Sequence, residues 1–186
     1  AASLSGRINK RDGYVSDAGW GGKSNERDRW FARGQVLIEP SDQLKVRLIA
    51  DYDKINEVCC AVVNVRRSAA TSALEALGGK VNPASDPFGD VAWSNFASSN
   101  DIENWGISGQ ADYQVGPLKL TSITAWRESS SLTNQDSDFT SADLIGGNLG
   151  RTNIDTFTQE LRVSAGFMDV FNAMLGAYYF DEKVET

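Results

Sequence analysis

The sequence has no histidine, only two cysteines and four prolines among its 186 residues. Without histidine, the chain lacks a Ser-His-Asp triad, the commonest metal ligand in proteins and the usual general base near neutral pH. Gly146-Gly147 lacks the lysine that a phosphate-binding Walker motif requires. We therefore expect the protein not to be an enzyme, and we expect no cofactor and no resident metal.

Long apolar runs and clustered positive charge are also missing. Although 41% of the residues are hydrophobic, no run approaches the roughly 20 residues that a membrane-spanning helix needs. The formal net charge is -7 and the lysines and arginines look scattered, which argues against nucleic acid as a partner. The mean hydropathy of -0.34 is compatible with a β-barrel, because in a barrel the membrane signal lies in alternation.

What the chain does have is alternation of apolar and polar residues with period two, which is typical of β-strands. The clearest case is Leu44 to Tyr52, where the odd positions Lys45, Arg47 and Asp51 are charged. Residues 30–38 alternate in the same way, and Pro40-Ser41-Asp42 is expected to turn one strand into the other. The two segments predict a hairpin with a short turn.

The same pattern recurs along the chain. Further strands are expected near Ala2 to Lys10, Trp105 to Val115, Leu120 to Arg127, Phe157 to Ala165 and Phe171 to Phe180, with turns at Gly116-Pro117 and at Gly166 to Val170. These segments give about seven spans. Single-chain bacterial barrels have an even number of strands, and an open sheet in lipid would leave costly unpaired backbone groups. We therefore expect the chain to be part of a larger barrel.

The connections between the expected strands alternate between short turns and long polar segments. The long segments are residues 56–102 and 129–154, with a shorter one at 12–28. Outer-membrane barrels have short periplasmic turns on one rim and long extracellular loops on the other. Four aromatic residues fall near the expected strand ends, where interfacial girdles occur: Tyr52, Trp105, Tyr113 and Trp126. The predicted fold is all-β, an antiparallel up-and-down transmembrane β-barrel segment.

Four segments give the sequence a resemblance to the barrel of TonB-dependent outer-membrane receptors. They are Asp155 to Val163 with its Gln-Glu-Leu-Arg core, Gly176 to Phe180, Leu120 to Arg127, and Arg33-Gly34-Gln35. Together with the strand spacing, the resemblance covers nearly all of residues 1–186. It implies a barrel of about twenty-two strands filled by a plug domain, which imports scarce nutrients with energy relayed by the TonB complex. Neither the plug nor its TonB-contacting box is present in this sequence.

The resemblance also implies where the protein works and what it meets. The expected location is the bacterial outer membrane, with lipid and lipopolysaccharide outside, a small-molecule solute inside, and the TonB complex reached through the absent plug. Siderophores, vitamins, oligosaccharides and aromatic breakdown products all remain open as solutes. The polar inner set expected to face the plug or the solute path is Arg33, Gln35, Lys45, Arg47, Asp51, Gln110, Glu160 and Arg162.

Several residues in the long segments are candidates for ligand contact. Trp93, Phe96 and Phe139 could stack on a solute or anchor the loops. Asp136, Asp138 and Asp143 are spaced partly like a calcium loop, but the glycine and glutamate that an EF-hand needs are replaced by Ser141 and Gly147. A solvated acidic loop is the competing interpretation. Together with Arg47, the candidate set is Trp93, Phe96, Asp136, Asp138 and Phe139.

Two local features remain. Cys59 and Cys60 are neighbours and are expected either to form a vicinal disulfide in an oxidising exterior, to stay reduced, or to pair elsewhere. Ser68 to Leu77 predicts a short helix with Ala70, Leu74 and Leu77 on one face, ended by Gly78-Gly79.

Two other functions stay open from the sequence. The strands could instead form a soluble β-sandwich binding module, in which the face of Leu44 to Tyr52 packs against a second sheet. A barrel protein could also serve as a structural subunit of a larger outer-membrane assembly, with its transport path unused.

Overall fold

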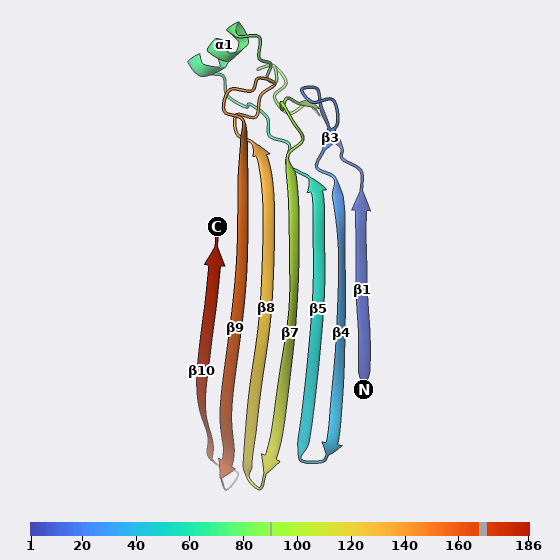
Figure 1. The fold of residues 1–186 in the computed structure, drawn as a ribbon, viewed down its shortest axis with the longest axis vertical. Helices are drawn as coiled ribbons and strands as arrows, with labels where there is room; N and C mark the ends of the chain where they lie inside the picture. Colours follow the sequence, from blue (N-terminus) through green and yellow to red (C-terminus); the bar gives the residue numbers. More distant parts are fainter. Residues whose placement is uncertain (90, 168–170) are drawn as a thin grey trace.

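The structure is a computed structural model that describes residues 1–89, 91–167 and 171–186. Its main feature is a seven-stranded sheet (Figure 1). The strands of this sheet are β1 (Ala2–Arg11), β4 (Arg27–Ser41), β5 (Leu44–Val58), β7 (Ser99–Val115), β8 (Leu118–Asp136), β9 (Gly147–Phe167) and β10 (Phe171–Glu185). The remaining elements are three short strands, β2 (Val15–Asp17), β3 (Lys23–Ser24) and β6 (Val91–Ala92), and one helix, α1 (Ala69–Ala76).

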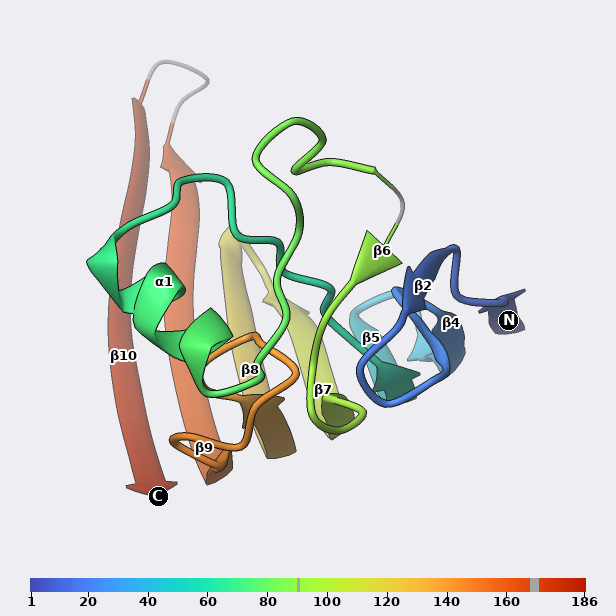
Figure 2. The same ribbon diagram turned by 90° about the horizontal axis from the view of Figure 1, so that it is seen from above.

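The seven strands lie side by side in the order in which they occur along the chain, and each pairs antiparallel with the next. This confirms the prediction of an all-β, up-and-down sheet of about seven strands. Strands β1 and β10 form its two edges, at opposite ends of the sheet in the view from above (Figure 2). Within the described residues the sheet is open and does not close into a barrel.

Short and long connections lie at opposite ends of the sheet (Figure 1). Two-residue turns at Asp42 and Gln43 and at Gly116 and Pro117 join the strands at one end. Gly116 has a φ of +55°, a conformation that glycine adopts without steric cost. The predicted turn at Pro40 is two residues early, because Pro40 lies in β4 at a register irregularity between Ile38 and Ser41. The turn predicted at 166–170 falls partly outside the described residues.

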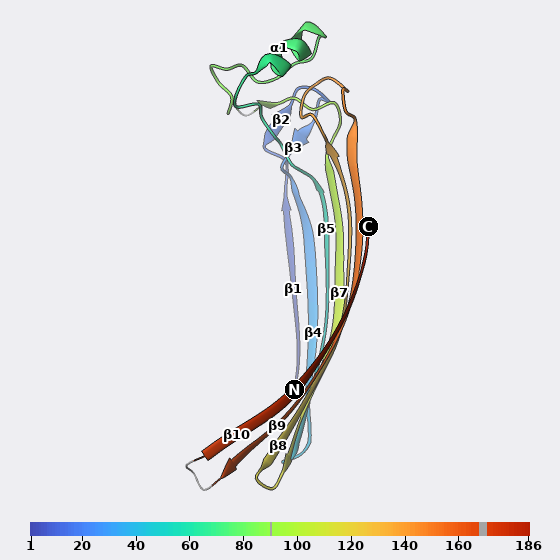
Figure 3. The same ribbon diagram turned by 90° about the vertical axis from the view of Figure 1, so that its left-hand side faces the viewer.

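The strands are longer and the loops shorter than predicted. The strands between β4 and β10 contain 15 to 21 residues, whereas about ten residues are enough to span a bilayer. The loops are therefore 59–98 and 137–146 rather than 56–102 and 129–154. Viewed from the side, the strands bow along their length and the loops stand beyond one end (Figure 3).

Helix α1 occurs where the sequence predicts it, with Ser68 as its N-cap and Gly78 following at a φ of +87°. Its predicted apolar face is right for Leu74, which is buried, and wrong for Ala70 and Leu77, which are exposed; Thr71 is the other buried residue. Lys80 follows the helix and Ser141 lies in loop 137–146. The two residues exchange two hydrogen bonds. No helix among the described residues has the length and hydropathy to cross a bilayer.

Candidate functional site

The two faces of the large sheet differ in chemistry. Because neighbouring residues of a strand point to opposite faces, the pairs Val36↔Leu48 and Ile107↔Trp126 place their side chains on one face, here called the apolar face. Leu48, Ile107 and Leu161 on this face are 48%, 55% and 53% exposed. Large apolar side chains thus stand uncovered across the sheet.

A row of aromatic residues crosses this face, with one residue from each of the strands β4, β5, β7, β8, β9 and β10. We call it the aromatic belt: Trp30, Tyr52, Trp105, Trp126, Phe157 and Tyr179. Trp30 stacks on Tyr52 with ring centroids 4.7 Å apart. Phe157 lies 6.4 Å from Trp126 and 6.2 Å from Tyr179, also between centroids. Tyr52 is paired directly opposite Trp105, and Trp126 is paired with Ile107, two residues along β7 from Trp105.

The apolar face changes character at the belt. Toward the short turns its positions on β5 and β7 are apolar down to Tyr113, which is paired with Leu44 and Leu120. On β8 and β9 the same face also carries Ser122, Thr124 and Gln159, which hydrogen-bond one another. Toward the long loops it becomes charged, and the Lys54 ammonium lies 2.7 Å from Asp101 and 3.3 Å from Glu103. The eight residue steps from Trp105 to Tyr113 span about 27 Å along the strand at about 3.4 Å per residue. The apolar band therefore has a defined height with a sharp upper limit.

The predicted position of the aromatic residues is therefore only partly right. Tyr52, Trp105 and Trp126 lie inside β5, β7 and β8 and not near the strand ends. The predicted strand ends are wrong because past the belt the strands continue without a regular alternation of apolar and polar residues, as Lys54 on the apolar face and the Ile55↔Ile102 pair on the opposite face show. The aromatic residues mark the edge of the apolar band.

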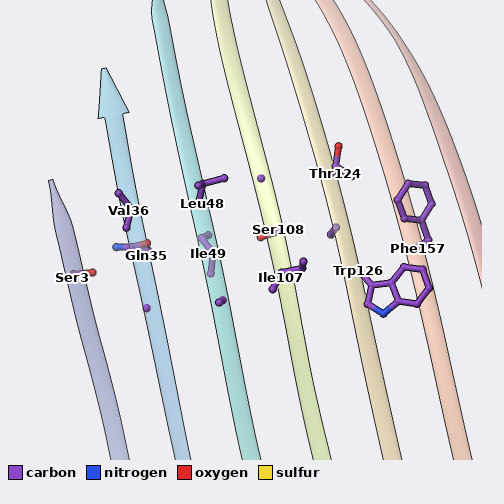
Figure 4. Close-up of a pocket in the computed structure, with 14 residues that line it drawn as sticks. Ser3, Gln35, Val36, Leu48, Ile49, Ile107, Ser108, Thr124, Trp126 and Phe157 are labelled. Carbon is purple, nitrogen blue, oxygen red and sulfur yellow. The ribbon is translucent and has the colours of Figure 1, made fainter. Parts of the chain in front are cut away.

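A shallow hollow of about 710 Å³ lies in the apolar band (Figure 4). Small residues form its floor, with Gly34, Ala50 and Gly109 on neighbouring strands. Larger side chains form its walls, among them Leu48, Ile107, Trp126 and Phe157. The hollow is open on one side and its surface is mostly apolar, although Ser3, Gln35, Ser108 and Thr124 also line it.

The opposite face, here called the polar face, is held by ion pairs that span more than one strand. Arg127 on β8 reaches across β7 to Asp51 on β5, with Nη2 2.8 Å from Oδ2. Gly106 on β7 makes room for it, since a Cβ there would lie 3.0 Å from Arg127 Nη1. A larger residue at 106 would obstruct this link.

The lower part of the polar face has a second network, centred on Asp112. Its carboxylate accepts hydrogen bonds from Thr121 at 2.5 Å and from Gln110 at 2.8 Å, and Lys119 lies 3.3 Å away. The predicted inner set shares this face, as the pairs Arg33↔Asp51, Arg47↔Gln110 and Lys45↔Asp112 show. Most of these polar groups are satisfied within the sheet.

Beyond the belt, the polar face contains the most buried ion pair of the sheet. Arg29 Nη2 donates to Glu57 Oε2 at 2.7 Å, and Arg29 Nε also bonds the same carboxylate. The Glu57 side chain is only 3% exposed. The hydrogen bonds from Arg29 lower the pKa of Glu57 despite the opposing effect of burial, so this carboxylate stays charged.

Two of the loop residues predicted to contact a ligand, Asp136 and Asp138, accept hydrogen bonds from the loops themselves. Asp136, fully buried, accepts hydrogen bonds from the backbone N–H groups of Asn95, Asp138 and Phe139. These bonds join loop 59–98 to loop 137–146. The Asp138 carboxylate likewise accepts from Thr140, Leu144 and Ile145. Its oxygens, like those of Asp136, point at backbone donors.

The aromatic candidates lie in the same loop assembly. The Lys80 ammonium stands 5.3 Å from the ring centroid of Trp93. Phe96 packs on Gly147, where a Cβ would lie 3.2 Å from its ring. Arg47 is separate from these residues, because it lies on the polar face of β5 opposite Gln110. The structure therefore brings Trp93, Phe96, Asp136, Asp138 and Phe139 together in the loops, without Arg47.

Cys59 and Cys60 are joined to each other by a disulfide immediately after β5. The side-chain amide of Asn100 on β7 donates to Cys59 Sγ at 3.2 Å. The pair thus lies at the junction between the sheet and the longest loop. Among the described residues no group of three or more acidic, cysteine or histidine side chains is arranged to hold a metal ion.

Sequence reasoning missed a group of arginines on the polar face. Arg7 and Arg11 on β1 and Arg27 and Arg29 on β4 all point to this face, as does the predicted Arg33, and the register of the two strands shows it. The interpretation that the cations are scattered is therefore wrong for these two strands. These arginines occupy odd positions in the sequence of both strands, but their grouping on one face becomes apparent only when β1 and β4 are paired in register.

Comparison with known proteins gives no match, whether with family models, curated proteins or solved structures.

Proposed function

We propose that this chain forms part of the wall of a transmembrane β-barrel in the bacterial outer membrane. In this proposal the apolar face meets lipid and the polar face lines the lumen. The observation that carries it is the aromatic belt, which separates an exposed apolar band from a charged region on the same face. Aromatic side chains favour the interface between hydrocarbon and water, because they have an apolar body and a polar edge.

The height of the apolar band supports this proposal. A barrel strand is tilted by about 40°, so about 27 Å along the strand corresponds to roughly 20 Å across a membrane. An outer-membrane barrel has an apolar band about 25 Å tall. The strand segments beyond the belt, such as 53–58 of β5, would then project from the membrane and support the loops.

The exposed apolar side chains also favour lipid over a second protein layer supplied by this chain. A β-sandwich would require another sheet of comparable size over the apolar face. The other sheet that the structure describes has strands of two or three residues, β3-β2-β6, and lies among the loops. It is too small to cover seven strands of 10 to 21 residues.

The open edges define what the barrel still needs. Each unpaired backbone N–H or C=O group in lipid costs several kcal/mol. Strands β1 and β10 present such groups along the two edges of the sheet. The proposal therefore includes further strands of the native protein, which pair with both edges and close the wall.

Within this proposal the barrel belongs to a TonB-dependent importer of a scarce nutrient. The support is the sequence resemblance, whose main segment, Asp155 to Val163, occupies the middle of β9. The polar face provides a wettable surface for a solute, and the long loops stand at one rim where a solute would enter.

Cell fractionation followed by uptake assays tests this function. The native protein should fractionate with the outer membrane and remain there after washing with high salt, because lipid contact does not depend on charge. Uptake of its nutrient should stop in a strain without TonB and return when TonB is restored. Recovery of the protein in the soluble fraction would contradict the barrel, whereas TonB-independent uptake through an outer-membrane protein would contradict only the importer.

A further inference from the structure

A pocket of about 400 Å³ lies on the polar face where β1, β4 and β5 meet, beyond the belt. Its polar lining includes Arg7, Asn9, Arg27, Arg29 and Asp53, while Phe31 and Ile55 add an apolar surface. We propose that this pocket binds a small organic polycarboxylate with a planar apolar body.

The pocket has more positive than negative charge. Asp53 is engaged by Asn104, which donates to it at 2.8 Å, and Glu57 is paired with Arg29. Among the described residues, the side chains of Arg7 and Arg27 make no ion pair, and Arg27 acts on Glu57 only at longer range. The guanidinium groups of Arg7 and Arg27 therefore remain available to bind an anion, although the net charge of the chain is -7.

The arrangement of these cations is unfavourable in the absence of an anion. Arg11 is paired directly opposite Arg27 across the two strands, and like charges at such positions destabilise a sheet. Part of this cost is offset at Arg11, which donates to the carbonyl of Asn25 at 2.8 Å and lies over the ring of Tyr14. Arg27 has no comparable contact with any residue that the structure describes. A bound anion would supply the missing counter-charge.

The side chains around the pocket specify the chemistry of that anion. The planar guanidinium fork of arginine matches the two oxygens of a carboxylate. Half-buried Phe31 lies directly between Arg7 on β1 and Asp53 on β5 in the strand register. An aromatic ring at this position favours a flat apolar body in the ligand. The ligand therefore combines several carboxylates with a planar core.

This inference rests on the proposed function in one respect, since it names the class of solute that the lumen would receive. Binding itself needs only the folded protein. It is therefore measured on native protein purified in detergent, separately from membrane insertion and uptake.

The probe is trimesate, benzene-1,3,5-tricarboxylate, and calorimetric titration measures its dissociation constant. Arg7→Gln and Arg27→Gln should each weaken binding about 10-fold or more, because each removes a charge-assisted hydrogen bond. The matched control is Arg151→Gln, which removes an exposed guanidinium from β9 outside the pocket and should change binding less than twofold. The neutral trimesamide should bind at least 10-fold more weakly than trimesate.

The stability of the variants keeps the test decisive. Arg27→Gln removes the repulsion with Arg11, so its midpoint of denaturation should be unchanged or higher. Loss of trimesate binding with retained stability supports the proposal. Equal binding by all three variants, equal binding of trimesamide, or absence of trimesate binding to the folded native protein would each overturn it. Destabilisation by Arg7→Gln and Arg27→Gln without any trimesate binding would show that another part of the protein supplies the anion.

Discussion

The same seven strands are stabilised differently on their two faces. On the polar face, charges find partners inside the sheet, as Arg127 does with Asp51 and Arg29 with Glu57. On the apolar face, Leu48, Ile107 and Leu161 have large uncovered surfaces. The polar face is thus largely complete within the protein, whereas the apolar face depends on whatever surrounds it. In the proposed barrel, this difference places the apolar face against lipid and the polar face toward the lumen.

A lysine introduced on each face at the same height should give the largest difference in unfolding free energy between the two faces. Leu48→Lys puts an ammonium in the middle of the apolar band and should lower the free energy of unfolding by about 2–4 kcal/mol in lipid vesicles, because charge is costly at the bilayer midplane. Denaturant titration of the vesicle-inserted native protein measures the change.

The control is Ser108→Lys, on the polar face opposite Ile49 and one residue away from the partner of Leu48. It should change the free energy of unfolding by less than about 1 kcal/mol, because the polar face is wet and charged. Equal costs for the two variants would show that both faces meet the same medium, and the comparison between them would fail.

Loss of a buried carboxylate should have the next largest effect, this time on the polar face. Glu57→Ala leaves Arg29 without its partner and should cost about 1–3 kcal/mol of unfolding free energy, reduced from the fully buried case because Arg29 is partly exposed. Glu185→Ala removes a carboxylate of comparable type from the exposed pair with Lys183. That control should be nearly neutral. A neutral Glu57→Ala would show that the polar face does not depend on its internal ion pairs.

Two glycines on β7 offer a smaller and sharper test. Gly106→Val would push the Arg127 guanidinium away from Asp51, and should cost about 1 kcal/mol, since overpacking and a weakened ion pair add. Gly109→Val is its match on the apolar face, where a Cβ would lie at an ordinary 3.4 Å from Leu48. Thermal or chemical denaturation should show little change for Gly109→Val. The reverse order would contradict the assignment of faces.

The smallest expected effect lies within the aromatic belt. A double-mutant cycle on Trp30→Ala and Tyr52→Ala should give a coupling free energy of about 0.5–1.5 kcal/mol, the usual range for stacked rings. Val36 and Leu48, which are direct partners on the apolar face of the same two strands, provide a neighbouring pair without ring stacking. Their cycle should give a smaller coupling. Absence of coupling between the two rings would mean that the belt consists of independent residues.

The sequence predicted the sheet where alternation was strong. Leu44 to Tyr52 alternates because one side of β5 is apolar and the other charged, and the structure confirms this segment as a strand. Past Tyr52 the positions on the apolar face become Lys54 and Asn56, yet pairing with β7 continues to Val58. The alternation signal ends at the belt because polar residues enter the apolar face and Ile55 and Ile102 lie on the opposite face, whereas backbone pairing continues.

The same reasoning explains the loop bounds and the missed pocket. Residues 129–136 are mostly polar and were interpreted as loop, but they pair with β9. Arg7 and Arg27 are far apart in sequence and match no local motif, so only the register of β1 against β4 brings them together. The sequence suggests Asp136 as a candidate for ligand contact. Its burial among backbone N–H donors is not predictable from the sequence, because it depends on how two distant loops meet.

Fluorescence quenching of single tryptophans by brominated lipids tests most directly whether the apolar face of the sheet lies in the membrane. Two variants of the native protein would keep either Trp126 in the belt or Trp93 in the loops, with every other tryptophan replaced by phenylalanine. In vesicles that contain lipids brominated near the headgroup, we expect strong quenching of Trp126 fluorescence and little quenching of Trp93 fluorescence. Equal quenching of both, or quenching of neither, would contradict a sheet whose apolar face lies in the membrane.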